Sequence, residues 1–332
     1  MNQSTTKHSV SLLEAVNLAL ASEMRRDKDI VLLGEDIGVN GGVFRATDGL
    51  RDEFGLKRVM DTPLAETMIA GLTVGMATQG LKPVAEIQFM GFIFPALEQI
   101  VCHSARMRNR TRGRLSCPMV VRAPFGGGIH APEHHSESTE TLLAHIPGLK
   151  VVIPSSPARA YGLLLAALRD PDPVIFLEPK RIYRSQQQEV EDSGAALPIG
   201  KCFTLREGSD ITLVSWGAMI QETLEAANTL SQQNIDCEVI DLVSISPLDI
   251  ETILASVRKT GRLVIIHEAP RNAGMGAEIA ATVAEKALLD LQAPITRVTG
   301  YDTVMPYFRL EHHYMPNTQD ILDAVNQTME FV

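Results

Sequence analysis

The sequence predicts an α/β protein with two doubly wound domains, each built on a parallel sheet covered by helices. Short β-branched runs such as IVLLG (30–34) alternate with helical patterns of ten or more residues along the chain, which is typical of a covered parallel sheet. The length of 332 residues is enough for about two domains. The polar stretch SQQQEVEDSGAALPIG (185–200) contains Gly and Pro and indicates a linker.

The elements of the first domain follow from the apolar runs and the helical patterns between them. In order, we expect a helix at 11–26, a strand at 30–34, a helix from 63, a strand at 83–89, a long helix near 92–109, strands at 118–124 and 149–154, a helix at 157–169 and a strand at 173–179. Asp61 or Thr62 can cap the helix from 63, and Pro63 suits its first turn.

A second series of alternating elements begins beyond the polar stretch. In order, we expect a strand at 210–216, a helix at 219–233, a strand at 237–242, a helix at 249–259, a strand at 262–268, a helix from 274, a strand at 295–300 and a helix that ends near 330. We therefore predict domains at 1–188 and 201–332, joined by a linker at 189–200.

Composition excludes several classes of protein. The balance of 45% hydrophobic and 21% charged residues is that of a soluble globular protein, and a net charge of -10 argues against nucleic-acid binding. No apolar run approaches the roughly 20 residues of a membrane span, and the polar N-terminus MNQSTTKHSV carries no secretory signal. The four cysteines show no CxxC spacing. We therefore expect free thiols in a cytoplasmic protein that binds neither membrane nor nucleic acid.

Glu66 does not fit the helix in which it lies. In DTPLAETMIAGLTVGMATQG (61–80) it stands one position too late for a capping box that begins at Thr62. At helical spacing its neighbours form an apolar packing face: Ile69, Ala70, Thr73 and Val74. Two interpretations follow from the residues alone, an acid favoured by the helix dipole and a carboxylate with a chemical task.

Two loops are candidates for a binding site. In FGGGIHAPEHHSES (125–138), three glycines allow close backbone approach, and His130, His134 and His135 lie within six residues. A surface loop, an acid/base site and a metal site are all compatible with this pattern. EIQFMGFIFPALEQI (86–100) places Glu86, Gln88 and several aromatic residues at the end of a strand, where the rings either fill the core or stack on a planar ligand.

The usual sequence motifs give no support for a nucleotide-binding protein or a hydrolase. GMGAEI (274–279) lacks the third glycine of a dinucleotide fingerprint and favours a tight helix start, and the sequence has no Walker loop, HExxH or GxSxG.

Several long segments resemble the beta subunit of the thiamine-diphosphate-dependent 2-oxo acid dehydrogenases. They are GEDIGVNGGVFRATDGL (34–50), DTPLAE (61–66), EIQFMGFIFPA (86–96), RAPFGGG (122–128), HHSES (134–138), PGLKVVIPSSP (147–157) and DPVIFLEPKRIYR (172–184). The pattern is most similar to the bacterial two-chain pyruvate dehydrogenases. The resemblance implies a transketolase-like pyrimidine-binding domain followed by a transketolase C-terminal domain.

The resemblance also implies that the active site is shared between two chains. In the family an alpha chain holds the diphosphate and magnesium of thiamine diphosphate through a GDG motif, and the beta chain holds the aminopyrimidine. This sequence contains no GDG, so it resembles half an active site. The implied partners are an alpha subunit, in a heterotetramer of two alpha and two beta chains, and a dihydrolipoamide acyltransferase core with its lipoyl domain.

Individual roles follow by resemblance. Glu66 matches the glutamate that hydrogen-bonds N1′ of the aminopyrimidine and favours the 4′-imino form, which removes the thiazolium C2 proton. Phe92, where many relatives have Tyr, is expected to stack on the pyrimidine, and Leu64 and Gln88 to line its pocket. His135 matches a histidine that assists acyl transfer to lipoamide. A potassium site, built largely from backbone carbonyls, maps to Met119, Ala167, Leu168, Asp170 and Asp172.

The expected activity is oxidative decarboxylation of pyruvate with transfer of the acetyl group to lipoyl groups, which yields acetyl-CoA in the complex. The branched-chain 2-oxo acid enzyme is an alternative, because FLEPKRIY (176–183) also resembles that branch, and acetoin dehydrogenase is a third. Two hypotheses of other classes are a complete single-chain transketolase-like enzyme and a non-catalytic assembly subunit. The missing GDG argues against the first, and Glu66 and His135 argue against the second.

Overall fold

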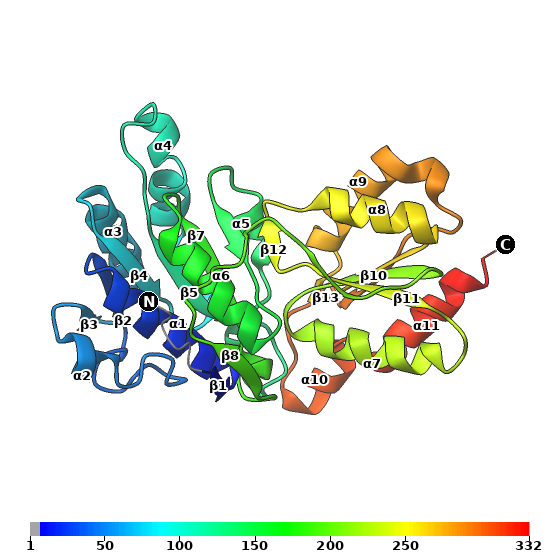
Figure 1. Cartoon of the computed structure of the whole chain (residues 1–332), viewed down its shortest axis with the longest axis horizontal. Coiled ribbons are helices and arrows are strands. Elements are labelled where there is room, and N and C mark those ends of the chain that lie inside the picture. Colours follow the sequence, from blue (N-terminus) through cyan, green and yellow to red (C-terminus); the bar gives the residue numbers. More distant parts are fainter. Residues whose placement is uncertain (1–6, 332) are drawn as a thin grey trace. The chain divides into compact units, whose positions relative to one another are not determined.

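The structure, a computed structural model, describes residues 7–331 and divides them into two compact units. Unit 1 is the described part of Met1–Phe125 together with Leu142–Ile199, and unit 2 is Gly126–Thr141 together with the described part of Gly200–Val332. Each unit has its own helix-covered sheet (Figure 1). The domain bounds expected from the sequence remain predictions.

The sheet of unit 1 has the strand order β6-β7-β5-β4-β2-β3, and all these neighbours are parallel. Its strands are β2 (Ile30–Gly34), β3 (Val59–Asp61), β4 (Lys82–Glu86), β5 (Val120–Phe125), β6 (Lys150–Val152) and β7 (Val174–Pro179). Every residue of β2, β5 and β7 is buried. Continuous apolar runs form these strands because helices cover both faces of a parallel sheet.

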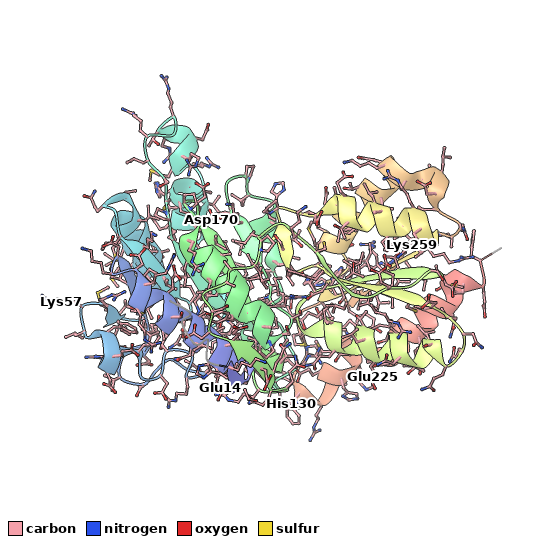
Figure 2. The ribbon with its side chains drawn as sticks, in the orientation of Figure 1. Glu14, Lys57, His130, Asp170, Glu225 and Lys259 are labelled. Carbon is pink, nitrogen blue, oxygen red and sulfur yellow. The ribbon has the colours of Figure 1, made fainter. Side chains whose placement is uncertain are left out.

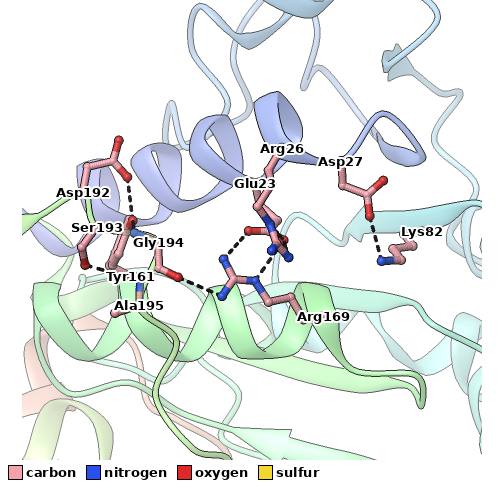
Figure 3. A network of polar contacts seen from close by, with 10 residues as sticks. All are labelled: Glu23, Arg26, Asp27, Lys82, Tyr161, Arg169, Asp192, Ser193, Gly194 and Ala195. Carbon is pink, nitrogen blue, oxygen red and sulfur yellow. Dashed lines mark hydrogen bonds and ion pairs between the residues drawn. The ribbon is translucent and has the colours of Figure 1, made fainter. Parts of the chain in front are cut away.

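Helices of unit 1 pack around this sheet. They are α1 (Leu12–Arg26), α2 (Leu50–Phe54), α3 (Glu66–Thr78), α4 (Met107–Arg110) and α6 (Pro157–Arg169), and the chain passes from unit 2 back to unit 1 within α5 (Glu140–Ala144). A capping box of Ser11 and Glu14 starts α1. Helices α1 and α6 lie side by side, and the buried carboxylate of Glu23 joins them by accepting from Arg169 Nη2 at 2.6 Å (Figure 3).

Two parts of unit 1 differ from the sequence expectation. The helix expected near 92–109 is broken into η1 (Met90–Phe92), η2 (Phe94–Ala96), a π-helix η3 (Glu98–Ser104) and α4. Pro95 cannot donate a backbone hydrogen bond, so it interrupts a regular helix. The short, mostly polar segments β1 (Lys7–Val10) and β8 (Gln188–Glu191) form an antiparallel ladder. The sequence does not predict these strands, because neither contains an apolar run. The single turn η5 (Lys180–Ile182) precedes β8.

The sheet of unit 2 has the order β14-β13-β10-β11-β9, parallel throughout except for the edge strand β9. Its strands are β9 (Phe203–Arg206), β10 (Ile211–Ser215), β11 (Cys237–Asp241), β13 (Leu263–Pro270) and β14 (Thr296–Gly300), and the unit also holds the short β12 (Ser244–Ser246). The expected class of two doubly wound α/β domains is confirmed.

Helices lie on both faces of this second sheet. Helices α7 (Ile220–Ser231) and α11 (Thr318–Met329) cover one face, and α8 (Ile250–Thr260) and α9 (Met275–Ala287) cover the other (Figure 1). The shorter elements are α10 (Phe308–Tyr314), η4 (Glu133–His135), η6 (Gly217–Met219) and η7 (Leu288–Asp290).

Arg122 of β5 forms a buried ionic cluster at the centre of unit 1. Its Nε donates to Glu178 Oε1 at 2.6 Å, and its Nη1 donates to Glu86 Oε2 at 2.9 Å. The hydroxyl of Tyr183 also donates to Glu178 Oε2, at 2.6 Å. Burial raises the pKa of Glu86, Arg122 offsets part of that rise, and the charge of Glu178 adds to it. One guanidinium therefore holds together the strands β4, β5 and β7.

Replacing Arg122 with Met should destabilise unit 1 strongly. The change leaves the carboxyls of Glu86 and Glu178 buried without their shared cation, which costs about 3–5 kcal/mol in comparable sites. Arg25→Ala is the matched control, because Arg25 pairs with Glu53 in an exposed position where such pairs contribute about 0–1 kcal/mol. Urea denaturation followed by far-UV circular dichroism measures both. Equal losses in the two variants would contradict the central role of the cluster.

Glu140 is a fully buried carboxyl in unit 2. Burial raises its pKa to about 8, and the charge of Glu268 adds to the rise, while its own backbone N–H and the indole of Trp216 offset part of it. At neutral pH the folded protein therefore keeps Glu140 mostly protonated.

Glu140 should make the folded state less stable as the pH rises. Its pKa is near 4.3 in an unfolded chain, so from about pH 4.5 to about 8 the folded state holds a proton that the unfolded state has lost. Stability then falls across this window and levels off above it. Glu140→Gln should flatten this dependence in urea denaturation at pH 5.5, 7 and 8.5, whereas Glu285→Gln, an exposed position of α9, should not. A wild-type slope in Glu140→Gln would show that Glu140 ionises normally.

Candidate active site

The carboxyl ends of β2, β3 and β4 meet at one edge of the unit 1 sheet, where α/β folds bind ligands. Glu35 follows β2, the segment 62–66 follows β3, and Gln88 follows β4. The expected site residues Leu64, Glu66 and Gln88 therefore gather at this edge.

Glu66 is the first residue of α3, which begins three residues later than the sequence predicts. The segment before it is not helical: Thr62 N–H donates to Gly34 O at 3.0 Å, Leu64 lies in a bend, and Ala65 has φ −162° and ψ 78°. Neither expected cap is used. Asp61 accepts from Gly38 N–H at 2.6 Å and pairs with Arg51, and Ala65 is the N-cap without a side-chain bond.

Half-buried Glu66 stands beside a second carboxyl. Burial raises the pKa of Glu35, and the negative charge of Glu66 adds to this rise, followed by that of Asp36. One oxygen of Glu35, Oε1, is buried without a hydrogen-bond partner within residues 7–331. Glu35 is not among the site residues that the sequence predicts. Its only signal is its position directly after a buried strand at the edge that also carries Glu66.

The aromatic side of the site comes from η1 and the chain around it. Phe92 is half-buried, and its ring meets Phe89 edge-on with centroids 5.5 Å apart. Phe89 in turn contacts Phe44 at 5.5 Å. Thr67 Oγ1 donates to Pro95 O at 2.8 Å and ties α3 to this aromatic segment.

The apolar side chains at this edge are only partly covered by the chain itself. Leu64 is 80% exposed, and Gln88 and Phe92 are half-buried. A carboxylate, an amide, a leucine and an aromatic face suit one side of a flat ring that carries hydrogen-bonding nitrogens. The residues present therefore fit the aminopyrimidine half of the implied cofactor.

His135 belongs to unit 2, in the segment 126–141, whereas Glu66 belongs to unit 1. It is half-buried in η4, and its ring centroid lies 4.5 Å from that of exposed His134. His130 is 75% exposed and pairs with Glu311. No group of three or more His, Cys, Asp or Glu within residues 7–331 is arranged to hold a metal ion, so the histidines of this loop do not form such a cluster.

The residues of the implied potassium site lie together around the end of α6. Ala167 and Leu168 are in its last turn, and Asp170 is its C-cap (Figure 2). Val174 N–H donates to Met119 O at 3.0 Å and brings that residue alongside β7. Asp170 already pairs with Lys150, and Asp172 with Arg108. A hard cation here would rely on backbone carbonyl oxygens, and those of a helix C-terminus suit it.

No helix in the described part of the chain is both long and apolar enough to cross a membrane.

Comparison with known proteins identifies the family. Residues 8–186 match the model of the transketolase pyrimidine binding domain, and residues 200–321 match that of the transketolase C-terminal domain. The pyruvate dehydrogenase E1 component subunit beta of Staphylococcus epidermidis is 49% identical over 97% of this chain and 99% of its own. The protein of the same name from Bacillus subtilis is 47% identical over the same shares.

A solved structure gives independent support for the fold. A split-gene transketolase, described as an inactive beta4 tetramer, superposes with a TM-score of 0.80 over 98% of this chain and 99% of its own. At 24% identity it bears on the fold alone. Sequence and fold agree, and the chain belongs to the family of pyruvate dehydrogenase E1 beta subunits, with transketolase-type pyrimidine-binding and C-terminal domains.

Proposed function

We propose that this chain is the beta subunit of a pyruvate dehydrogenase decarboxylating component, which decarboxylates pyruvate and transfers the acetyl group to lipoyl groups of an acyltransferase core. The observation that carries this proposal is Glu66, held at the carboxyl edge of the unit 1 sheet beside Leu64 and near a second carboxyl. The names of the relatives agree with it.

The chain supplies one half of the site and a partner supplies the other. The sequence has no GDG diphosphate motif. Met68 and Leu72 lie about one turn apart on α3, Leu64 precedes that helix, and all three are 41% exposed or more. An apolar row of this kind on the element that carries the site favours a protein interface. An alpha subunit would cover it and hold the diphosphate and magnesium, in a tetramer of two alpha and two beta chains.

Thiamine diphosphate, when bound, supplies the carbon nucleophile and the electron sink for decarboxylation. Glu66 would accept a hydrogen bond from the protonated N1′ of the aminopyrimidine and stabilise the proton on that nitrogen. Leu64 and Gln88 line the pocket, and Phe92 offers its ring face to the pyrimidine. His135 of unit 2 handles a proton in the later transfer to the lipoyl sulfur.

The proposal also includes a potassium ion with a structural role. The cation would join the end of α6 to the start of β5 through carbonyls of Met119, Ala167 and Leu168, with Asp170 and Asp172 in the same turn. The four cysteines are free thiols, which supports a reducing, cytoplasmic location.

Purified alone, this chain should neither bind thiamine diphosphate tightly nor decarboxylate a 2-oxo acid. Co-expression with an alpha chain should give a tetramer with a higher kcat/KM for pyruvate than for 3-methyl-2-oxobutanoate. Gel filtration and steady-state turnover with magnesium measure these outcomes. Turnover by the isolated chain would contradict the proposal that it holds only half of the active site. Preference for 3-methyl-2-oxobutanoate would favour the branched-chain alternative, which FLEPKRIY (176–183) supports.

Glu66→Gln should keep the fold and the tetramer but remove the proton shift. Gln is nearly isosteric, and an amide is easier to bury than a charge, yet it cannot polarise N1′ as a carboxylate does. Turnover should fall by about 10²–10⁴. The direct measurement is exchange of the cofactor's C2 proton for deuterium in the assembled enzyme.

Glu189→Gln is the matched control for this change, because Glu189 is exposed on β8, in the separate β1–β8 ladder, where it pairs with Lys7. If Glu66 were only an acid favoured by the helix dipole, its loss would cost about 0.3–1 kcal/mol of stability and leave the exchange intact. Wild-type exchange of C2–H in the Glu66→Gln tetramer would therefore rule out the assigned role, however low its turnover.

A further inference from the structure

The segment 126–141 leaves unit 1 after β5 and belongs to unit 2. It carries His135 on the single turn η4 and is otherwise mostly irregular. Irregular backbone fixes a side chain only where other contacts hold it. Two buried carboxylates of unit 2, Glu311 and Glu268, make such contacts.

Glu311 of α10 holds the middle of the segment. It is 3% exposed, and its Oε2 accepts the backbone N–H of His130 at 2.9 Å. His130 Nδ1 lies 3.1 Å from the same oxygen, and the residue stands beside α10 (Figure 2). His130 adopts φ +60°, a left-handed conformation uncommon for residues other than glycine. The carboxylate therefore stabilises a strained turn five residues before His135.

Glu268 of β13 accepts a hydrogen bond near one end of the segment and packs against the backbone at the other. Ser138 Oγ donates to Glu268 Oε1 at 2.9 Å, three residues after His135. Gly126 has φ +85°, and a Cβ at this position would lie 2.0 Å from the same oxygen, so only glycine fits against the carboxylate. Gly126 N–H also donates to Glu137 O at 3.0 Å and closes the segment into a loop.

We propose that Glu268 and Glu311 are positioning residues that fix the 126–141 segment, and through it His135, for the acyl-transfer step. The inference rests on the role of His135 in the proposed function. Hydrogen bonds to a buried carboxylate are stronger than those between neutral groups, and they bracket His135 at 130 and 138. A reacting group held in this way keeps its geometry without a regular helix or strand beneath it.

Hydrogen exchange tests the positioning directly in the tetramer assembled with an alpha chain. Glu311→Ala and Ser138→Ala should each speed amide exchange within 126–141 by about tenfold or more. Glu311→Gln should restore protection, because its amide oxygen still accepts from His130 N–H. Glu133→Ala is the control, since Glu133 lies in the same segment and its half-buried side chain pairs with neighbouring His134. Wild-type exchange in Glu311→Ala and Ser138→Ala would overturn the inference.

Activity measurements then test whether Glu268 and Glu311 act through His135. His135→Ala should depress the overall reaction through lipoyl groups more than the reaction with an artificial electron acceptor. Glu311→Ala and Ser138→Ala should show the same split, and combining either with His135→Ala should add little further loss. If only His135→Ala shows the split, the two carboxylates do not position it. If His135→Ala shows none, the proposed role of His135 fails, and the exchange rates alone decide whether the carboxylates hold the segment.

Discussion

The buried pairing of Arg122 with Glu86 and Glu178 is the interaction on which the candidate site in unit 1 depends. Glu86 is the last residue of β4, so its contact with Arg122 fixes the point from which the chain continues to Gln88 and Phe92. Glu86 also packs closely against the loop after β2, because a Cβ on Gly42 would lie 2.9 Å from Glu86 Oε1. The ionic cluster thus contacts two of the chain segments that reach the carboxyl edge, the one after β4 and the one after β2.

The parts of the fold that the sequence predicts are those that local pattern determines. IVLLG (30–34) and VIFLEP (174–179) are fully buried strands because their runs are apolar on both faces. The sequence does not reveal the start of α3, because the non-helical segment before it includes a bond between Thr62 and Gly34, which are neighbours only through the sheet. The edge strand β9 has half-exposed, mixed residues, so its sequence carries little signal.

The candidate site follows the same division. Glu66 was found because a carboxylate against Ile69, Ala70, Thr73 and Val74 breaks the helical pattern, and all four of those residues are buried. Glu35 was missed because nothing in its local sequence reveals that a second acid lies near it. The sequence does not predict the attachment of 126–141 to unit 2 for the same reason. The bond between Ser138 and Glu268 joins residues 130 positions apart in the sequence, and that between His130 and Glu311 joins residues 181 positions apart.

The two proposed catalytic groups are held by different physical means. Glu66 starts a helix whose first backbone bond runs from Ile69 N–H to Ala65 O at 2.9 Å, and the short segment 62–65 joins this helix to β3 of the unit 1 sheet. His135 stands on a loop held by side-chain carboxylates of unit 2. The position of Glu66, and with it the proposed proton transfer, therefore depends on the backbone of the unit 1 sheet. Acyl transfer at His135 is governed by a few side-chain contacts, so single substitutions at those contacts can separate the two steps of the proposed reaction.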